Sequence, residues 1–77
     1  MNITKAIAKL EKLGAKIEKQ NQTVYAKIEG KKSIYIGVNP DGNCICFGLV
    51  LGYDNIQQQA DMSWYDNLTQ VIRAATR

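Results

Sequence analysis

The chemistry that this chain could perform rests first on its two cysteines, because it contains no histidine. Cys44 and Cys46 are separated by one residue within an apolar stretch. On a strand this spacing points both side chains to one face, with their Cα atoms about 6.5–7 Å apart, at or beyond the usual limit for a disulfide. The pair also lacks the further ligands that a zinc site needs. We therefore expect two reduced structural thiols, and an intermolecular or zinc-bridged contact is the alternative.

Other side chains form no catalytic or phosphate-binding motif. Histidine, the commonest general base and metal ligand, is absent. The aspartates fall in or near expected turns and helix starts, which is their ordinary structural use. No glycine-rich loop leads a strand into a helix, and a strand cysteine among apolar residues tends toward inertness. The sequence therefore predicts that the protein is not an enzyme and holds no cofactor or metal.

Length and composition predict one small globular domain spanning residues 1–77. The chain is 45% hydrophobic and 22% charged, as in ordinary globular proteins. No apolar stretch approaches the roughly 20 residues of a membrane span. The N-terminus lacks the layout of a signal peptide, because lysines recur through it. We expect a cytoplasmic protein with no membrane partner.

The order of sequence patterns predicts an α+β fold. Four stretches of alternating apolar and polar residues lie between Ala15 and Gly52, separated by turn signals at residues 21–22, 30–32 and 40–43. A helical pattern over residues 3–13 ends at Gly14, and a second helix is expected to open with a capping box over residues 63–66. We predict a two-layer sandwich of order α-β-β-β-β-α, with a four-stranded antiparallel meander and both helices on one face.

Turn lengths decide which residues share a face of this sheet. A three-residue turn at 30–32 keeps Ile34 and Ile36 on the face of Val24, and a four-residue turn at 40–43 pairs Ile36 with Phe47. The expected buried face holds Ile17, Val24, Ala26, Ile28, Ile34, Ile36, Val38, Ile45, Phe47, Leu49 and Leu51. The expected outer face holds Lys16, Glu18, Tyr25, Lys27, Ser33, Tyr35, Gly37, Cys44, Cys46, Gly48 and Val50, with the ring of Tyr35 over Gly48.

Two groups of residues are candidates for binding a partner. Aromatic side chains among small residues on the outer face, together with the long connector over residues 53–64, suit a protein partner; the residues are Tyr25, Lys27, Tyr35, Tyr53 and Trp64. A ridge of lysines on the first helix, joined by the second turn, is either a solvated face or a phosphate-binding surface; its residues are Lys5, Lys9, Lys12, Lys31 and Lys32.

Charge is polarised along the chain, which indicates a partner surface. Eight lysines and three glutamates give residues 1–32 a net charge of +5, whereas two arginines and four aspartates give residues 33–77 a net charge of −2. We expect a small non-enzymatic protein that binds or inhibits another protein, a class that includes anti-CRISPR-type accessory factors of phages and mobile elements. A nucleic-acid-binding module that uses the lysines is one alternative, and a homo-oligomeric subunit is another.

Overall fold

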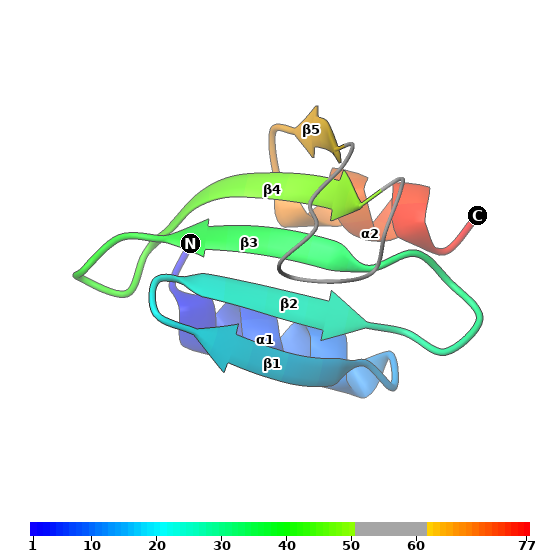
Figure 1. Cartoon of the computed structure of the whole chain (residues 1–77), viewed down its shortest axis with the longest axis horizontal. Coiled ribbons are helices and arrows are strands. Elements are labelled where there is room, and N and C mark those ends of the chain that lie inside the picture. Colours follow the sequence, from blue (N-terminus) through cyan, green and yellow to red (C-terminus); the bar gives the residue numbers. More distant parts are fainter. Residues whose placement is uncertain (51–61) are drawn as a thin grey trace.

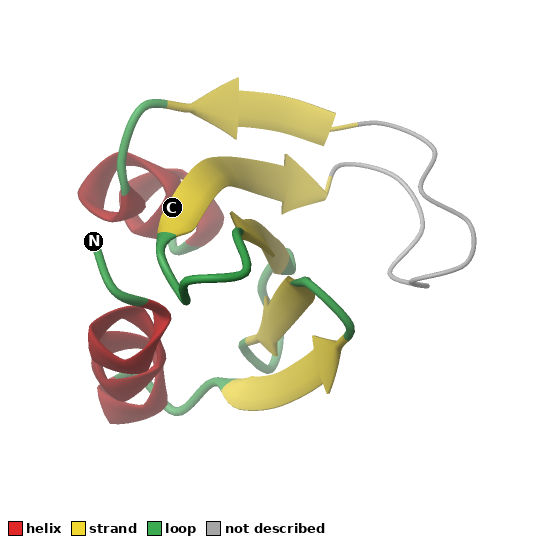
Figure 2. Cartoon of the chain, turned by 90° about the vertical axis from the view of Figure 1, so that its left-hand side faces the viewer, coloured by secondary structure: helices red, strands yellow, loops and turns green. Residues whose placement is uncertain are grey.

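The computed structural model of this protein describes residues 1–50 and 62–77. Seven elements follow one another in these residues: α1 (Ile3–Lys12), β1 (Lys16–Gln20), β2 (Thr23–Lys27), β3 (Ile34–Val38), β4 (Cys44–Val50), β5 (Met62–Tyr65) and α2 (Leu68–Ala75). The strands form one antiparallel sheet in the order β1-β2-β3-β4-β5 (Figure 1). Both helices lie on the same side of it (Figure 2). The α+β class is confirmed, and the expected count of four strands is corrected to five.

Helix α1 begins and ends at the residues that its sequence pattern predicts. The side chain of Asn2 accepts a hydrogen bond of 2.7 Å from the backbone of Thr4, which caps the first turn. Gly14 has a φ of +84°, and Ala15 donates to the carbonyl of Leu10 at 3.1 Å, so the helix ends in a left-handed glycine cap. The start of α1 is also tied to the sheet, because Ile3 donates to the carbonyl of Gly42 at 2.8 Å.

In the first two hairpins, the side chains lie on the faces of the sheet that the turn lengths predict. Strands β1 and β2 pair as expected, with Ile17 opposite Ala26. Strand β2 pairs with β3 so that Val24 lies opposite Ile36, two residues away from the register of a three-residue turn. The reason is that Lys31 donates to the carbonyl of Ile28 at 2.9 Å, so the turn begins earlier than expected. Because the displacement is even, every side chain of β3 stays on its predicted face.

The third hairpin differs from the prediction by one residue, which produces a β-bulge at Ile45. Gly42 has a φ of +84° and donates to the carbonyl of Asn39, so the turn needs three residues rather than four. Val38 consequently pairs with Cys44, whereas Ile36 still pairs with Phe47. The extra residue is Ile45, whose side chain is 64% exposed rather than buried, and Cys44 packs against the core rather than on the outer face. Both assignments are corrected here.

The segment expected to open the last helix is strand β5. Met62–Tyr65 pairs with β4, and α2 begins at Leu68 after the N-cap Asn67. The side chain of Asn67 accepts from the backbone of Gln70 at 2.9 Å, and the side chain of Gln70 accepts from the backbone of Asp66 at 3.3 Å. Asn67 is thus the N-cap of α2, four residues after the expected one, and the Gln70 side chain reaches to the residue before it, which makes the pair a variant of the capping box. The residues before this cap form β5, which pairs with β4.

The core lies between the sheet and the two helices. Its fully buried large side chains come from all layers: Leu10 from α1, Ile34 and Ile36 from β3, and Val71 from α2. Helix α1 contacts β1, whereas α2 contacts β3, β4 and β5. Leu51 was expected in this core and lies outside the described residues. The opposite face of the sheet carries no helix (Figure 2).

Candidate binding face on the helix-free side of the sheet

Three aromatic rings form a row across the helix-free face. Tyr25 and Tyr35 are direct cross-strand partners, and their ring centroids are 5.3 Å apart at an interplanar angle of 80°. The ring of Tyr35 meets that of Trp64 in the same edge-to-face manner, at 5.7 Å and 87°. The sequence prediction that Tyr25 and Tyr35 share a face on neighbouring strands is confirmed. The contact with Trp64 depends on β5 and was not anticipated.

Gly48 makes that second contact possible. It lies between Tyr35 on β3 and Trp64 on β5 as the cross-strand partner of both. A Cβ atom at Gly48 would lie 3.1 Å from Cζ3 of Trp64 and 3.3 Å from Sδ of Met62. Tyr35 lies opposite this glycine as expected, and the indole ring of Trp64 is the group nearest to the place of its missing Cβ atom. Trp64 is therefore held in place although its side chain is 59% exposed.

The β-bulge adds the side chain of Ile45 to this face, next to Cys46. A Cβ atom at Gly37 would clash with Sγ of Cys46 and would lie 3.5 Å from Cγ1 of Ile45 and 3.8 Å from Cε1 of Tyr35. The bulge thus brings Ile45 beside the aromatic row, where Cys46 lies opposite Gly37 as expected. We call the resulting surface the aromatic patch, and it consists of Tyr35, Ile45, Cys46, Met62 and Trp64.

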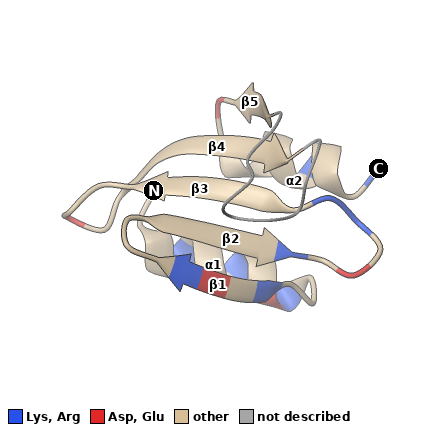
Figure 3. Ribbon diagram, viewed as in Figure 1, with Lys and Arg blue, Asp and Glu red and all other residues tan. Residues whose placement is uncertain are grey.

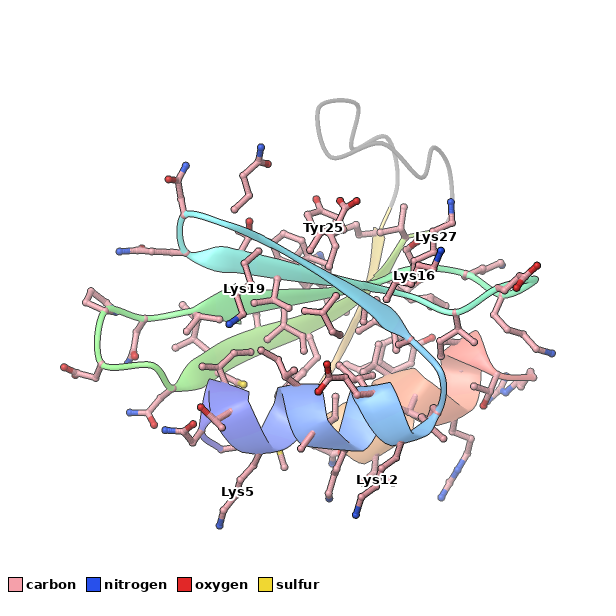
Figure 4. The ribbon with its side chains drawn as sticks, turned by 90° about the horizontal axis from the view of Figure 1, so that it is seen from below. Lys5, Lys12, Lys16, Lys19, Tyr25 and Lys27 are labelled. Carbon is pink, nitrogen blue, oxygen red and sulfur yellow. The ribbon has the colours of Figure 1, made fainter. Side chains whose placement is uncertain are left out.

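The other predicted site residues differ in how far they can reach a partner. Tyr25 is only 5% exposed, so it packs beside Tyr35 and offers little surface itself; it was expected to be exposed. Ser33 and Val50, also expected on the outer face, are buried as well. Lys27 is exposed and lies with Lys16 on the side of the sheet where Tyr25 lies (Figure 4). Tyr53 lies outside the described residues.

Burial raises the pKa of two groups, the Tyr35 hydroxyl on this face and the Cys44 thiol on the core side. It raises the pKa of the Tyr35 hydroxyl, and the neighbouring Cys46 adds to the rise. It also raises the pKa of the Cys44 thiol, to which Cys46 adds and which the amino group of Met1 partly opposes. A thiol with a raised pKa is a poor nucleophile at neutral pH. Both cysteines are free thiols, and within residues 1–50 and 62–77 no three His, Cys, Asp or Glu side chains converge as a metal site.

The lysines of the chain project from several sides of the molecule, and those of the alternative site come from α1 and from the loop between β2 and β3 (Figure 3 and Figure 4). Lys5 and Lys12 project from α1 on the side of the molecule opposite Lys16 and Lys27 (Figure 4). Lys31 and Lys32 lie on the loop between β2 and β3, at the end of the sheet on the side of the C-terminus (Figure 3). Most of the basic residues therefore lie in one half of the molecule, on α1, β1 and that loop (Figure 3). Their side chains point to several faces of that half (Figure 4).

Comparison with protein-family models, curated proteins and solved structures found no significant match to this chain. Neither helix in the described residues has the length and hydrophobicity required to cross a membrane. The aromatic patch and the distribution of charge are thus the observations from which a function can be argued.

Proposed function

We propose that this protein is a small non-enzymatic binding protein that docks on another protein through the aromatic patch. The observation that carries the proposal is Trp64, which is 59% exposed yet fixed between the ring of Tyr35 and the backbone of Gly48. A large aromatic side chain that is already ordered loses little conformational entropy when a partner covers it. Tryptophan and tyrosine are also the residue types that most often dominate interface energetics.

The chemistry around the patch supports binding rather than catalysis. The chain has no histidine, and the raised pKa of Cys44 disfavours the nucleophilic thiolate. Met62 lies beside Trp64 at Gly48, and Ile45 and Cys46 lie beside Tyr35 at Gly37, which together give an apolar surface that suits a protein partner with a complementary apolar pocket. Inhibition or adaptation of a larger machine, as by accessory proteins of phages and mobile elements, is the mode of action that we propose for such a module.

The test is capture of partners with matched variants. Trp64→Ala removes the anchor, whereas Leu13→Ala removes an exposed apolar side chain (45% exposed) at the end of α1, away from the patch. We expect proteins captured from cells of the source organism by the wild type and by Leu13→Ala to be lost with Trp64→Ala. Ile45→Thr should weaken the same capture, because Ile45 belongs to the patch. Partners retained by Trp64→Ala and Ile45→Thr would refute the proposal.

Self-association through β5 is a second candidate, favoured by the contrast between the two sheet edges. Edge strand β1 carries Lys16, Glu18 and Lys19, which discourage strand addition. Edge strand β5 has the sequence Met-Ser-Trp-Tyr and carries no charge. A second copy that pairs with β5 would also cover Trp64. Light scattering at increasing protein concentration tests this: a dimer that Trp64→Lys abolishes supports it, and a monomer throughout excludes it.

Binding to nucleic acid through the lysines of α1 remains the third candidate. Its observation is the charge of +5 over residues 1–32. Binding of this kind must weaken steeply as salt increases, because phosphate contacts release counterions. Titration of duplex and single-stranded oligonucleotides at low salt tests it. We expect weak binding that Lys5→Gln and Lys9→Gln reduce, and absence of binding at low salt removes the candidate.

A further inference from the structure

A cleft of about 590 Å³ opens on the helix side of the sheet, away from the aromatic patch. Lys31 and Lys32 of the β2–β3 loop form one wall. Leu49 and Tyr65 of the sheet, with Ala74 and Ala75 of α2, form the apolar part. Arg77 closes the other side. The loop and the C-terminus lie at the same end of the molecule (Figure 3). A cleft of this size accommodates a small organic molecule.

The charge of the cleft is strongly positive. Lys31, Lys32 and Arg77 contribute three cations, and the described residues that line the cleft include no carboxylate. The C-terminal end of α2 contributes only about half a negative charge. Even a free carboxylate directly after Arg77 would leave a positive excess. Three cations that converge without paired anions are the arrangement that recognises phosphate groups.

Local hydrogen bonds fix the backbone from which two of these cations project. Gly30 has a φ of +75°, and Lys31 donates to the carbonyl of Ile28 at 2.9 Å, which closes the turn. The carbonyl of Ser33 accepts from Val50 at 2.9 Å and anchors the loop to β4. Only the long side chains of Lys31 and Lys32 must be ordered when an anion binds, which lowers the entropic cost.

Local hydrogen bonds also fix the backbone on the opposite side of the cleft, where α2 ends before Arg77. The backbone of Thr76 donates to the carbonyl of Ile72 at 3.0 Å, and its hydroxyl donates to the same carbonyl at 2.8 Å, so the residue before Arg77 is held at the end of α2. Ala74 and Ala75 leave the space between α2 and the loop unfilled, because neither side chain extends beyond Cβ. The floor beside them is apolar, formed by Leu49 and the ring of Tyr65.

We propose that this cleft binds a small phosphorylated organic molecule of the nucleoside-diphosphate class. Its phosphates would lie between Lys31, Lys32 and Arg77, and its organic body would lie on the half-buried ring of Tyr65, beneath which Leu49 is buried. This site is independent of the aromatic patch, since it occupies the other face of the sheet. On this proposal, the basic residues of the β2–β3 loop and Arg77 bind the ligand, whereas the lysines of α1 form a solvated ridge.

The test compares two triple variants with the same change in charge. ADP and inorganic pyrophosphate are titrated at physiological salt, followed by calorimetry and by NMR shifts of backbone amides. We expect ADP to bind more tightly than pyrophosphate, with shifts at residues 30–32 and 74–77. Lys31→Gln/Lys32→Gln/Arg77→Gln should weaken ADP binding by about tenfold or more. Lys5→Gln/Lys9→Gln/Lys12→Gln should change it by less than about twofold, because these lysines do not line the cleft and salt screens their charges.

A substitution without charge change isolates the organic part of the ligand. Ala74→Met fills the cleft with a good helix former, and we expect it to abolish the preference for ADP over pyrophosphate. Equal weakening by both triple variants would show diffuse attraction by the basic surface and would overturn the proposal. Absence of binding at millimolar ADP, or tighter binding of an oligonucleotide that depends on the α1 lysines, would overturn it as well.

Discussion

The indole ring of Trp64 lies against the backbone of Gly48, its cross-strand partner, so closely that a Cβ atom on the glycine would come within 3.1 Å of Cζ3. The ring also meets Tyr35 edge to face across that glycine. Gly48 thus provides the space into which an aromatic side chain from the edge strand packs. Its lack of a side chain orders a residue that is otherwise exposed.

The first prediction concerns the contact between Gly48 and Trp64. Gly48→Ala should destabilise the fold by about 1–3 kcal/mol, because the indole ring must move away from the new methyl group. The fluorescence of Trp64, the one tryptophan of the chain, should change at the same time. Denaturant unfolding of Gly48→Ala, Trp64→Ala and the double variant forms a cycle. The double variant should lose less than the sum of the single ones; strict additivity would show that the two residues do not interact.

The second prediction separates the core from the bulge. Phe47 is 7% exposed and pairs with Ile36 under the helices, so Phe47→Ala should cost about 3–5 kcal/mol and come close to unfolding a domain of this size. Ile45→Ala, two residues away on the same strand, should change stability by no more than about 0.5 kcal/mol, because its side chain is exposed. Similar losses at both positions would contradict the bulge.

The third prediction locates the start of α2. Asn67→Ala should cost about 1 kcal/mol, since it removes the side-chain acceptor that satisfies the backbone of Gln70. Ser63→Ala should cost clearly less, because Ser63 lies within β5 and caps no helix. Thermal unfolding of the two variants provides the comparison. A larger loss for Ser63→Ala would restore the earlier helix start that the sequence pattern favoured.

The fourth prediction follows from the raised pKa of the Cys44 thiol. At pH 8 the folded Cys46→Ser variant should react with iodoacetamide more slowly than the same variant in denaturant, because less thiolate is present. Folding favours the protonated thiol, so its contribution to stability is complete below the pKa of the unfolded thiol. That contribution decreases as pH rises through the folded value. Faster alkylation in the folded state would show that the pKa is lowered instead.

Local patterns in the sequence determined much of this fold. Helix α1 could be delimited from Asn2 and Gly14, since caps are local hydrogen-bonded structures. The alternation of apolar residues determined that Tyr25 and Tyr35 share a face, because any even change in register preserves it. The pairing of Ile36 with Phe47 was predicted from a four-residue turn, and it is present because the extra residue Ile45 compensates for the shorter turn.

Tertiary structure decided the features that create the candidate binding face. Four residues of β5 are too short to show a period, and they become a strand only because β4 is available to pair with them. The bulge at Ile45 reconciles a three-residue turn with the long-range register of β3 and β4, which no local window contains. The N-cap Asn67, with Gln70 three residues later, is visible in the sequence, but choosing it over Ser63 required knowing where the strand ends. Exposure of Trp64 and burial of Tyr25 likewise depend on which segments lie beside them, and that is a property of the assembled chain.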